Sequence, residues 1–339
     1  MKHDVAIIGG GVSGLTCGVL LAEHGYRAAI FAKETGQQTT SAVAAAVWYP
    51  YDAEPAGNVI AWALDTYKSL VDLSGEPRTG VSMMELRQFS RAGEVQIPDW
   101  AHSLGASVIS TEGACRAVAL REGREKSPII SPSRFKGGFA LTVPLMDTTI
   151  YLEYLASRFL AAGGSITANV FFEKLEDVDD EFVLVINCAG MGARELVHDV
   201  DLEPHRGQVA IVPKIDLGCA IVCDEPPLMY AIPRANDCVF GGTNELSDDR
   251  EIHPAVTSRI VAECSRVLKI SNPQILAERV GLRPFRKSGV RLERDCLRDG
   301  RTVIHNYGHG GAGFTLSWGC AREVVNLAHD DLRQRDGLE

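Results

Sequence analysis

The stretch NYGHGGAGFT, residues 306–315, holds four glycines and a histidine within ten residues. Each glycine inside a helix or strand costs roughly 0.5–1 kcal/mol relative to alanine, so the run indicates that main chain is needed here without side chains. The stretch is a flexible tail, a metal-binding loop, or a place where main chain contacts a ligand. The next residues, FTLSWGCAREVVNLA, are typical of a helix, whose first N–H groups attract electron-rich ligands.

Two histidines of this region, His305 and His309, are four residues apart, a spacing that binds metal ions when it lies on a helix. Gly308 lies between them and two more glycines follow, so we do not expect a helix at this point. The adjacent sequence offers neither an acidic nor a cysteine ligand. We therefore predict no metal site.

A second glycine cluster, Gly9, Gly11 and Gly14, follows the apolar run DVAII at residues 4–8. A helix-like segment and a second strand-like run, RAAIFA, come next, and the run ends in Lys33-Glu34. Strand, G-x-G-x-x-G turn, helix, strand and a late acid form the dinucleotide-binding pattern, in which the acid meets the ribose hydroxyls. The alternative is a glycine turn that only packs a helix on a strand.

An arginine-rich segment, GLRPFRKSGVRLE at residues 281–293, is the third candidate. Arginines on an acidic protein are usually surface ion pairs of little energetic value. Arg283, however, lies between Leu282 and Pro284, and an arginine in apolar surroundings is a natural bidentate partner for a carboxylate.

Small residues run into an aromatic patch in TTSAVAAAVWYPY, residues 39–51. This segment is either a packed connection or a loop where a flat ring approaches main chain, with Trp48 and Tyr49 as walls.

The chain has 339 residues, enough for about two domains, and 45% of them are hydrophobic. A net charge of −10 argues against a nucleic-acid partner. The nine cysteines include no C-x-x-C pair, which indicates neither a disulfide framework nor a zinc cage. Hydrophobic runs are shorter than the roughly 20 residues of a membrane span. We predict a cytoplasmic protein without a membrane partner.

The remaining pattern predicts helices over 58–72, 147–162 and 254–269, and strands over 165–172 and 182–190. The residues from 207–213 through 238–243 are also strand-like. Residues 80–140 alternate short strand-like runs with glycine, proline and serine. Because helix and strand segments return to the N-terminal sheet late in the chain, we expect two domains that are discontinuous in sequence.

Taken together, these motifs resemble those of the D-amino acid oxidase / D-aspartate oxidase family of FAD-dependent oxidases. The resemblance runs nearly end to end and is most specific in GLRPFR and in HNYGHGGAGFTLSWGCA. It also includes PLMDTTIYLEYL, VINCAGMGARELV, RGQ, MYAIPR and FGGT.

The resemblance implies an α/β fold: a Rossmann-like FAD-binding domain and a mainly antiparallel-sheet substrate domain, with the site between them. We assign 1–50, 140–200 and 290–330 to the FAD-binding domain, 51–139 and 201–289 to the substrate domain, and 331–339 to a tail. The implied reaction is oxidation of a D-amino acid by FAD and O2 to a 2-oxo acid, ammonia and hydrogen peroxide.

The resemblance also implies roles for particular residues. Arg283 binds the substrate carboxylate with help from the Tyr230 hydroxyl, and the Gly311 carbonyl takes the amino group, so no side-chain base is needed. The cofactor-binding residues carried over are Gly9, Gly11, Val12, Ser13, Gly14, Lys33, Glu34, Thr39, Thr40, Ser41, Ala45, Ala46, Val47, Leu175, Gly190, Arg283, Gly308, Gly310, Gly311, Ala312, Gly313, Phe314 and Thr315.

The sequence departs from the family pattern at the lid, where DEPPLMY lacks the animal enzymes' second tyrosine, and at Ala312, where an aromatic residue is common. We expect a wider pocket mouth that admits bulky apolar D-amino acids. A glycine- or sarcosine-type amine oxidase, or an oxidase selective for D-aspartate and D-glutamate with Arg234 or Arg286 as extra cation, remains the alternative. A nicotinamide-dependent dehydrogenase and a flavin-binding protein without turnover are further alternatives. The sequence leaves open a homodimer and whether Lys33 or Glu34 contacts the ribose.

Overall fold

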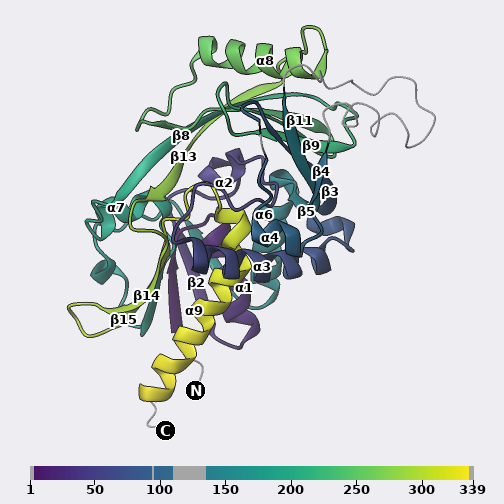
Figure 1. Cartoon of the computed structure of the whole chain (residues 1–339). Helices are drawn as coiled ribbons and strands as arrows, with labels where there is room; N and C mark the ends of the chain where they lie inside the picture. Colours follow the sequence, from purple (N-terminus) through teal and green to yellow (C-terminus); the bar gives the residue numbers. More distant parts are fainter. Residues whose placement is uncertain (1–3, 94, 110–134, 336–339) are drawn as a thin grey trace. The chain divides into compact units, whose positions relative to one another are not determined.

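The computed structural model describes residues 4–93, 95–109 and 135–335, which form two compact units (Figure 1). The first unit comprises Met1–Val81, Thr148–His205 and Leu282–Glu339, and the second comprises Ser82–Asp147 and Arg206–Gly281. Residues 51–81, 201–205 and 282–289, which we expect in the substrate domain, group with the first unit. Residues 140–147, which we expect in the FAD-binding domain, group with the second.

The first unit contains a six-stranded sheet in the order β14-β15-β7-β1-β2-β6. Its strands are β1 Asp4–Ile8, β2 Arg27–Ala32, β6 Ser165–Ala168, β7 Leu184–Asn187, β14 Arg291–Cys296 and β15 Thr302–Tyr307. The strands from β15 to β6 are parallel, and β14 is antiparallel to β15. The central strands are buried on both faces, which explains why β1 and β7 are nearly uniformly apolar.

The helices of the first unit are α1 Val12–Glu23, α2 Thr40–Val43, α3 Ala56–Leu73, α6 Thr148–Ala161, α7 Ala193–Leu196 and α9 Gly313–Arg335. Short 3-10 turns lie at Gly36–Gln38, Pro77–Thr79, Leu175–Asp177 and Gly190–Gly192. Helix α1 packs against α6 and α9, and α9, yellow in Figure 1, also packs against α3. Because α9 continues to Arg335, residues 331–335 are helical and do not form the expected tail; residues 336–339 lie outside the described part of the chain.

The second unit is built around a nine-stranded sheet in the order β12-β8-β11-β10-β9-β3-β5-β4, with β13 also paired to β8. The pairs β8–β11, β11–β10 and β10–β9 are antiparallel, as is the pair β4–β5. Strand β3 pairs with β9 in parallel. The strands are β3 Val81–Ser90, β4 Ser107–Ile109, β5 Gly137–Met146, β8 Leu202–Pro213, β9 Cys219–Cys223, β10 Met229–Pro233, β11 Asp237–Gly241, β12 Glu245–Leu246 and β13 Ala277–Arg286.

Two helices belong to this unit, α4 Asp99–Ser103 and α8 Pro254–Leu268. Helix α8 covers one face of the sheet, and its Ile260, Cys264 and Val267 form a core with residues of β8 to β11. Part of the region predicted as short strands, residues 110–134, lies outside the described residues.

The predicted α/β class is confirmed, as are the helices predicted over 58–72, 147–162 and 254–269, which are α3, α6 and α8. The predicted strands 165–172 and 182–190 are shorter than expected, because β6 ends at Ala168 and β7 at Asn187. None of the helices in the described ranges has the length and hydropathy of a membrane span.

Candidate active site

The turn between β1 and α1 is built around Gly9, Gly11 and Gly14, as the sequence predicts. A Cβ atom added to Gly14 would lie 2.0 Å from the carbonyl oxygen of Gly9, so the turn and the helix approach as closely as backbone allows. Gly9 itself has φ +118°, a conformation that favours glycine.

Hydrogen-bonding groups at this turn suit an anionic ligand. The N-cap residue of α1 is Gly11, which has no side chain to accept hydrogen bonds from the first N–H groups of the helix. The Ser13 hydroxyl is buried without a hydrogen-bond partner. A buried hydroxyl in that state costs free energy, and a phosphate oxygen at a helix N-terminus would satisfy it. The residues present therefore fit the pyrophosphate of a dinucleotide.

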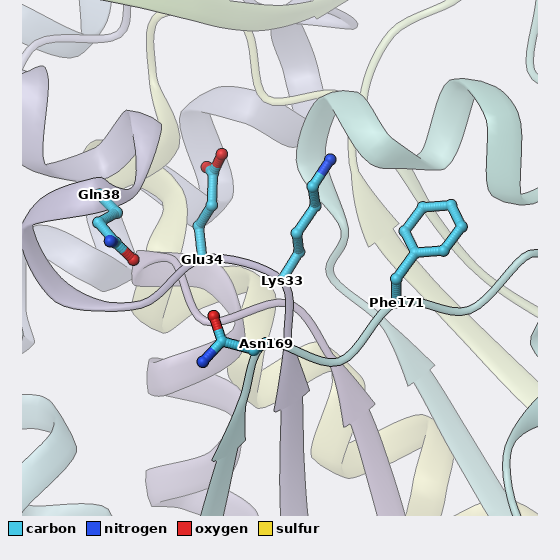
Figure 2. A pocket seen from close by; sticks show the side chains of 5 residues that line it. All are labelled: Lys33, Glu34, Gln38, Asn169 and Phe171. Carbon is cyan, nitrogen blue, oxygen red and sulfur yellow. The ribbon is translucent and has the colours of Figure 1, made fainter.

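A pocket of about 550 Å³ opens where β2 and β6 end, and Figure 2 shows the five side chains that line it. Ala32 of β2 pairs with Ala168 of β6, so Lys33 and Asn169 leave the sheet as neighbours. The pocket is lined by Lys33, Glu34, Gln38, Asn169 and Phe171. Its place at the carboxyl ends of parallel strands, beside the glycine turn, is the usual place for a nucleotide.

Lys33 and Glu34 are expected from the sequence at this pocket, whereas Gln38, Asn169 and Phe171 are not. Phe171 is 68% exposed and the Lys33 ammonium lies 5.7 Å from its ring centroid, a cation–π contact. Leu175, another expected cofactor residue, has its side chain in the core with Ala6 and Val185.

The small-residue segment lies between the glycine turn and the start of α9. Ser41 accepts a hydrogen bond from Val12 N–H at 3.0 Å, which ties α2 to the first turn of α1. Thr315 of α9 both donates to the carbonyl of Tyr49 at 3.0 Å and accepts from its N–H at 3.1 Å. The segment is therefore held at both ends by side-chain to main-chain hydrogen bonds. Of the other expected members, Thr39 and Ala45 are buried, Thr40 is half-buried at the start of α2, and Ala46 adopts φ +55° just before Val47.

Trp48 does not line a cofactor surface. It is fully buried, donates from Nε1 to the carbonyl of Ala63 at 3.1 Å, and meets Tyr67 edge to face. For this residue the packed-connection interpretation is correct.

The glycine loop joins β15 to α9, and α9 begins at Gly313, as the sequence predicts. Gly308 and Gly310 have φ +84° and +52°. Gly310 N–H donates to the Pro284 carbonyl at 2.8 Å, and His309 forms a β-bridge with Phe285. The loop is therefore held by main-chain contacts against the end of β13. Among its other expected members, Ala312, Phe314 and Thr315 are buried, and Gly190 starts a turn after β7.

His305 and His309 each have a hydrogen-bond partner within the protein. His305 Nδ1 lies 3.2 Å from Asn187 Nδ2, and His309 Nε2 lies 3.0 Å from Asn306 Oδ1. Burial lowers the pKa of each ring to about 4, so both are neutral at physiological pH. Within the described ranges, no three histidine, cysteine or acidic residues are grouped as a metal site would require.

Arg283 lies on β13, one residue before Pro284, and is partly buried. Because Pro284 and Phe285 contact the glycine loop through main chain, Arg283 and Gly311 are brought into one neighbourhood within the first unit. Arg286, also on β13, is paired with Asp199: its Nε donates to the carboxylate at 2.8 Å, and the Tyr307 hydroxyl donates to the same carboxylate at 2.6 Å.

An aspartate–histidine pair beneath the glycine loop is not predicted by the sequence. The Asp52 carbonyl accepts from Gly311 N–H at 3.4 Å, and its carboxylate lies 2.8 Å from His205 Nδ1. The His205 ring in turn stacks on Phe285 at 4.4 Å between centroids. We call Asp52, His205 and Phe285 the brace. It connects the glycine loop to the strand of Arg283, and no local motif reveals it because its members come from three distant segments.

In the second unit, Tyr230 lies on β10 and is partly buried. It pairs with Gly241 of β11, and a Cβ atom at Gly241 would lie 2.0 Å from Tyr230 Cζ, so glycine there gives room for the ring. Arg234, three residues past Ala231 on the same segment, forms a two-point ion pair with Asp237 at 2.7 Å and lies 4.0 Å from Asp147.

Comparison with known proteins agrees with this arrangement. The family model described as FAD dependent oxidoreductase (DAO) matches residues 4–327. The chain is 38% identical to a D-amino-acid oxidase of Rubrobacter xylanophilus, covering 95% of this chain and 94% of that one. It is 37% identical to a D-amino-acid oxidase of Streptomyces coelicolor, with 96% of both chains covered. Among solved structures, glycine oxidase from Bacillus cereus superposes with a TM-score of 0.79 at 18% identity, covering 97% of this chain and 96% of that one.

Proposed function

We propose that this chain, which belongs to the DAO family of FAD-dependent oxidoreductases, oxidises D-amino acids to 2-oxo acids with release of ammonia and hydrogen peroxide. FAD is its cofactor. The observation that carries the proposal is the attachment of the glycine loop to β13 through Gly310 N–H and the Pro284 carbonyl. It offers an α-amino acid a cation for its carboxylate, Arg283, and a main-chain acceptor for its amino group, Gly311.

The FAD would be held by residues from both ends of the chain. Gly9, Gly11, Ser13 and Gly14 take the pyrophosphate, and the pocket at Lys33 and Glu34 takes the ribose and adenine. The small-residue segment from Thr39 to Val47 and the loop from Gly308 to Thr315 bring main chain to the flavin ring. When bound, FAD supplies the electron acceptor for the Cα–H bond of the substrate.

Protein groups bind and orient the substrate in this proposal. Arg283 presents two parallel N–H donors to the carboxylate, and the Tyr230 hydroxyl adds a third donor. The Gly311 carbonyl accepts from the amino group and holds Cα in one orientation, which selects the D-enantiomer. The amine enters neutral in this proposal, so no side-chain base is needed to deprotonate it. His305 and His309 are buried and hydrogen-bonded, and burial lowers the pKa of each to about 4, which makes them weak bases. Water then hydrolyses the imino acid to the 2-oxo acid and ammonia.

The alternative of a D-aspartate- or D-glutamate-selective oxidase needs a second cation for the side-chain carboxylate. The two arginines suggested for it are already paired with carboxylates, Arg234 with Asp237 and Arg286 with Asp199. A relative named D-aspartate oxidase, from Homo sapiens, is 29% identical over 96% of this chain and 94% of its own. We therefore place D-aspartate and D-glutamate below neutral D-amino acids as substrates.

O2 as the oxidant, a homodimer and a cytoplasmic location belong to the same proposal. The described cysteines are all free thiols, which agrees with a reducing compartment. Oxygen consumption during turnover tests the oxidant, sedimentation velocity tests the dimer, and fractionation of cells tests the location.

A peroxide assay across D-amino acids, with their L-enantiomers as controls, tests the reaction. Arg283→Met should lower kcat/KM by about a hundred- to several-thousand-fold, because removing one partner of a buried ion pair costs roughly 3–5 kcal/mol. Arg294→Met is the matched control, since Arg294 of β14 is exposed and its guanidinium lies 3.7 Å from Asp331 of α9. Turnover of L- but not D-amino acids, or near-normal turnover by Arg283→Met, contradicts the proposal.

A further inference from the structure

One row of side chains crosses the second unit's sheet beside Tyr230. Strand pairing places Gln88 of β3 opposite Val222 of β9, Val222 opposite Tyr230 of β10, and Tyr230 opposite Gly241 of β11. The alternate residues Phe89, Ile221, Cys223 and Ala231 pack in the core beneath α8. Because successive strand residues point to opposite faces, the row lies on the face away from α8.

Asp224 joins this row from the residue after β9. It lies two residues beyond Val222, and its Oδ2 accepts a hydrogen bond from Gln88 Nε2 at 3.1 Å. Since Tyr230 is directly opposite Val222, Asp224 is its diagonal neighbour, and such Cα atoms are about 7–8 Å apart. The Tyr230 ring lies over Gly241 of β11 and the adjacent Gly242, on the side away from β9. Only a long substrate side chain can therefore reach from the Tyr230 hydroxyl back across the row to Asp224.

Within the described part of the chain, Asp224 is hydrogen-bonded to Gln88 and has Glu225 as its charged neighbour, and neither of these is a cation. Neighbouring Glu225 accepts from Ser90 and from the N–H groups of Arg91 and Ala92, and the Arg91 guanidinium donates to Glu263 and to the Pro227 carbonyl. Burial raises the pKa of the Asp224 carboxyl to about 6, with a smaller rise from Glu225 and an opposing hydrogen bond from Gln88.

Gln88 adds a second acceptor at the same place. Its Nε2 is used by Asp224, while its Oε1 is buried without a hydrogen-bond partner. An unsatisfied buried acceptor beside a desolvated carboxyl is costly, and one donor group between them relieves both.

We propose that Asp224 and Gln88 form a subsite for the cationic side chain of the substrate, which makes basic D-amino acids such as D-lysine and D-ornithine preferred over neutral ones of equal length. The inference rests on the proposed oxidation of D-amino acids and on Tyr230 binding the substrate carboxylate. Val222, apolar and buried between the two polar groups, contacts the methylene stem. A substrate ammonium group can donate hydrogen bonds to both the Asp224 carboxylate and Gln88 Oε1. An apolar side chain of the same length donates to neither.

The kinetic test compares D-lysine with D-norleucine, which has the same length of chain without the amine. We expect the wild-type ratio of kcat/KM to favour D-lysine, and Asp224→Asn to reduce that ratio about ten- to a hundredfold, the value of a hydrogen bond to a charged group. Asp216→Asn, which removes an exposed carboxylate of the same unit, is the control and should leave the ratio unchanged. Gln88→Met, which removes the second acceptor, should lower the ratio in the same direction.

An equilibrium test uses ligands that cannot react. 6-Aminohexanoate and hexanoate are lysine and norleucine without the α-amino group, and their binding to the holoenzyme is followed through the flavin absorption spectrum. The wild type should bind 6-aminohexanoate more tightly, and Asp224→Asn should remove the difference without weakening hexanoate. Equal affinities in wild type and variant overturn the subsite.

The two levels of the proposal fail in different ways. If the wild type oxidises D-norleucine and other neutral D-amino acids with no preference for D-lysine, the subsite is wrong and the oxidase stands. If the holoenzyme oxidises no D-amino acid, the proposed function is wrong, and the subsite falls with it.

Discussion

Replacing Gly14 by alanine probes the dinucleotide turn with a single methyl group. The added Cβ would lie 2.0 Å from the Gly9 carbonyl oxygen and 3.0 Å from its carbonyl carbon. Both atoms are main chain, so no side-chain rotation relieves the contact and the turn must separate from α1. Overpacking of this kind typically costs 1–3 kcal/mol, and we take about 3 kcal/mol because backbone has to move.

That free-energy cost changes one of two measurable quantities, the Kd for FAD or the stability of the apoprotein. If the empty turn relaxes, the apoprotein keeps its stability, and FAD binding has to restore the close approach. The Kd for FAD then rises roughly a hundredfold, since about 1.4 kcal/mol corresponds to tenfold. If the turn cannot relax, the urea midpoint of the apoprotein falls instead. Quenching of FAD fluorescence gives the first quantity, and unfolding of apoprotein gives the second.

Gly57→Ala is the matched control. Gly57 also lies in the first turn of a helix, α3, but a Cβ atom there meets nothing within 4 Å. Alanine should leave FAD binding unchanged and stabilise the helix by up to about 1 kcal/mol. A Gly14→Ala protein with normal FAD affinity and a normal urea midpoint would refute the argument that close backbone approach is required at this turn.

Two further predictions concern the substrate side of the site. His205→Phe keeps an aromatic ring stacked on Phe285 but loses the hydrogen bond to Asp52. We expect kcat/KM to fall about tenfold, the value of one such bond, with the Kd for FAD unchanged. Activity within twofold of wild type would show that the brace does not position Gly311. The preference for D-lysine over D-norleucine should rise as pH increases through about 6, because only the ionised Asp224 carboxylate attracts an ammonium group and its protonation below that pH removes the charge. Steady-state rates from pH 5 to 8 measure this ratio, and in Asp224→Asn it should be flat; a rise that persists in the variant would assign the titration to another group.

Local signals explain which parts of the fold the sequence predicts well. The β1 turn, α1 and β2 follow one another without interruption, and each has its own pattern: an apolar run, spaced glycines and a helical periodicity. The same reason explains why the sequence predicts the glycine loop and α9. Leu175 was expected at the cofactor by resemblance alone, and its side chain is part of the core.

Contacts between distant segments explain what the sequence does not reveal. Asn169 and Phe171 reach the pocket because Ala32 pairs with Ala168. The residues of the two strands do not by themselves determine this pairing register. The brace depends on Asp52 and His205, which are separated by 153 positions. Asp224 looks like an ordinary loop acid until strand pairing puts it beside Gln88 and Tyr230.

The sheet order of the first unit has a consequence for how the chain folds during synthesis. β7 lies between β1 and β15, yet β15 is made more than a hundred residues after β7. Until Thr302–Tyr307 leaves the ribosome, β7 is an edge strand with apolar residues and unpaired main-chain groups, the kind of edge that recruits other chains. Nascent chains stalled before residue 302 should therefore need a chaperone on that edge, and the need should end when β15 pairs.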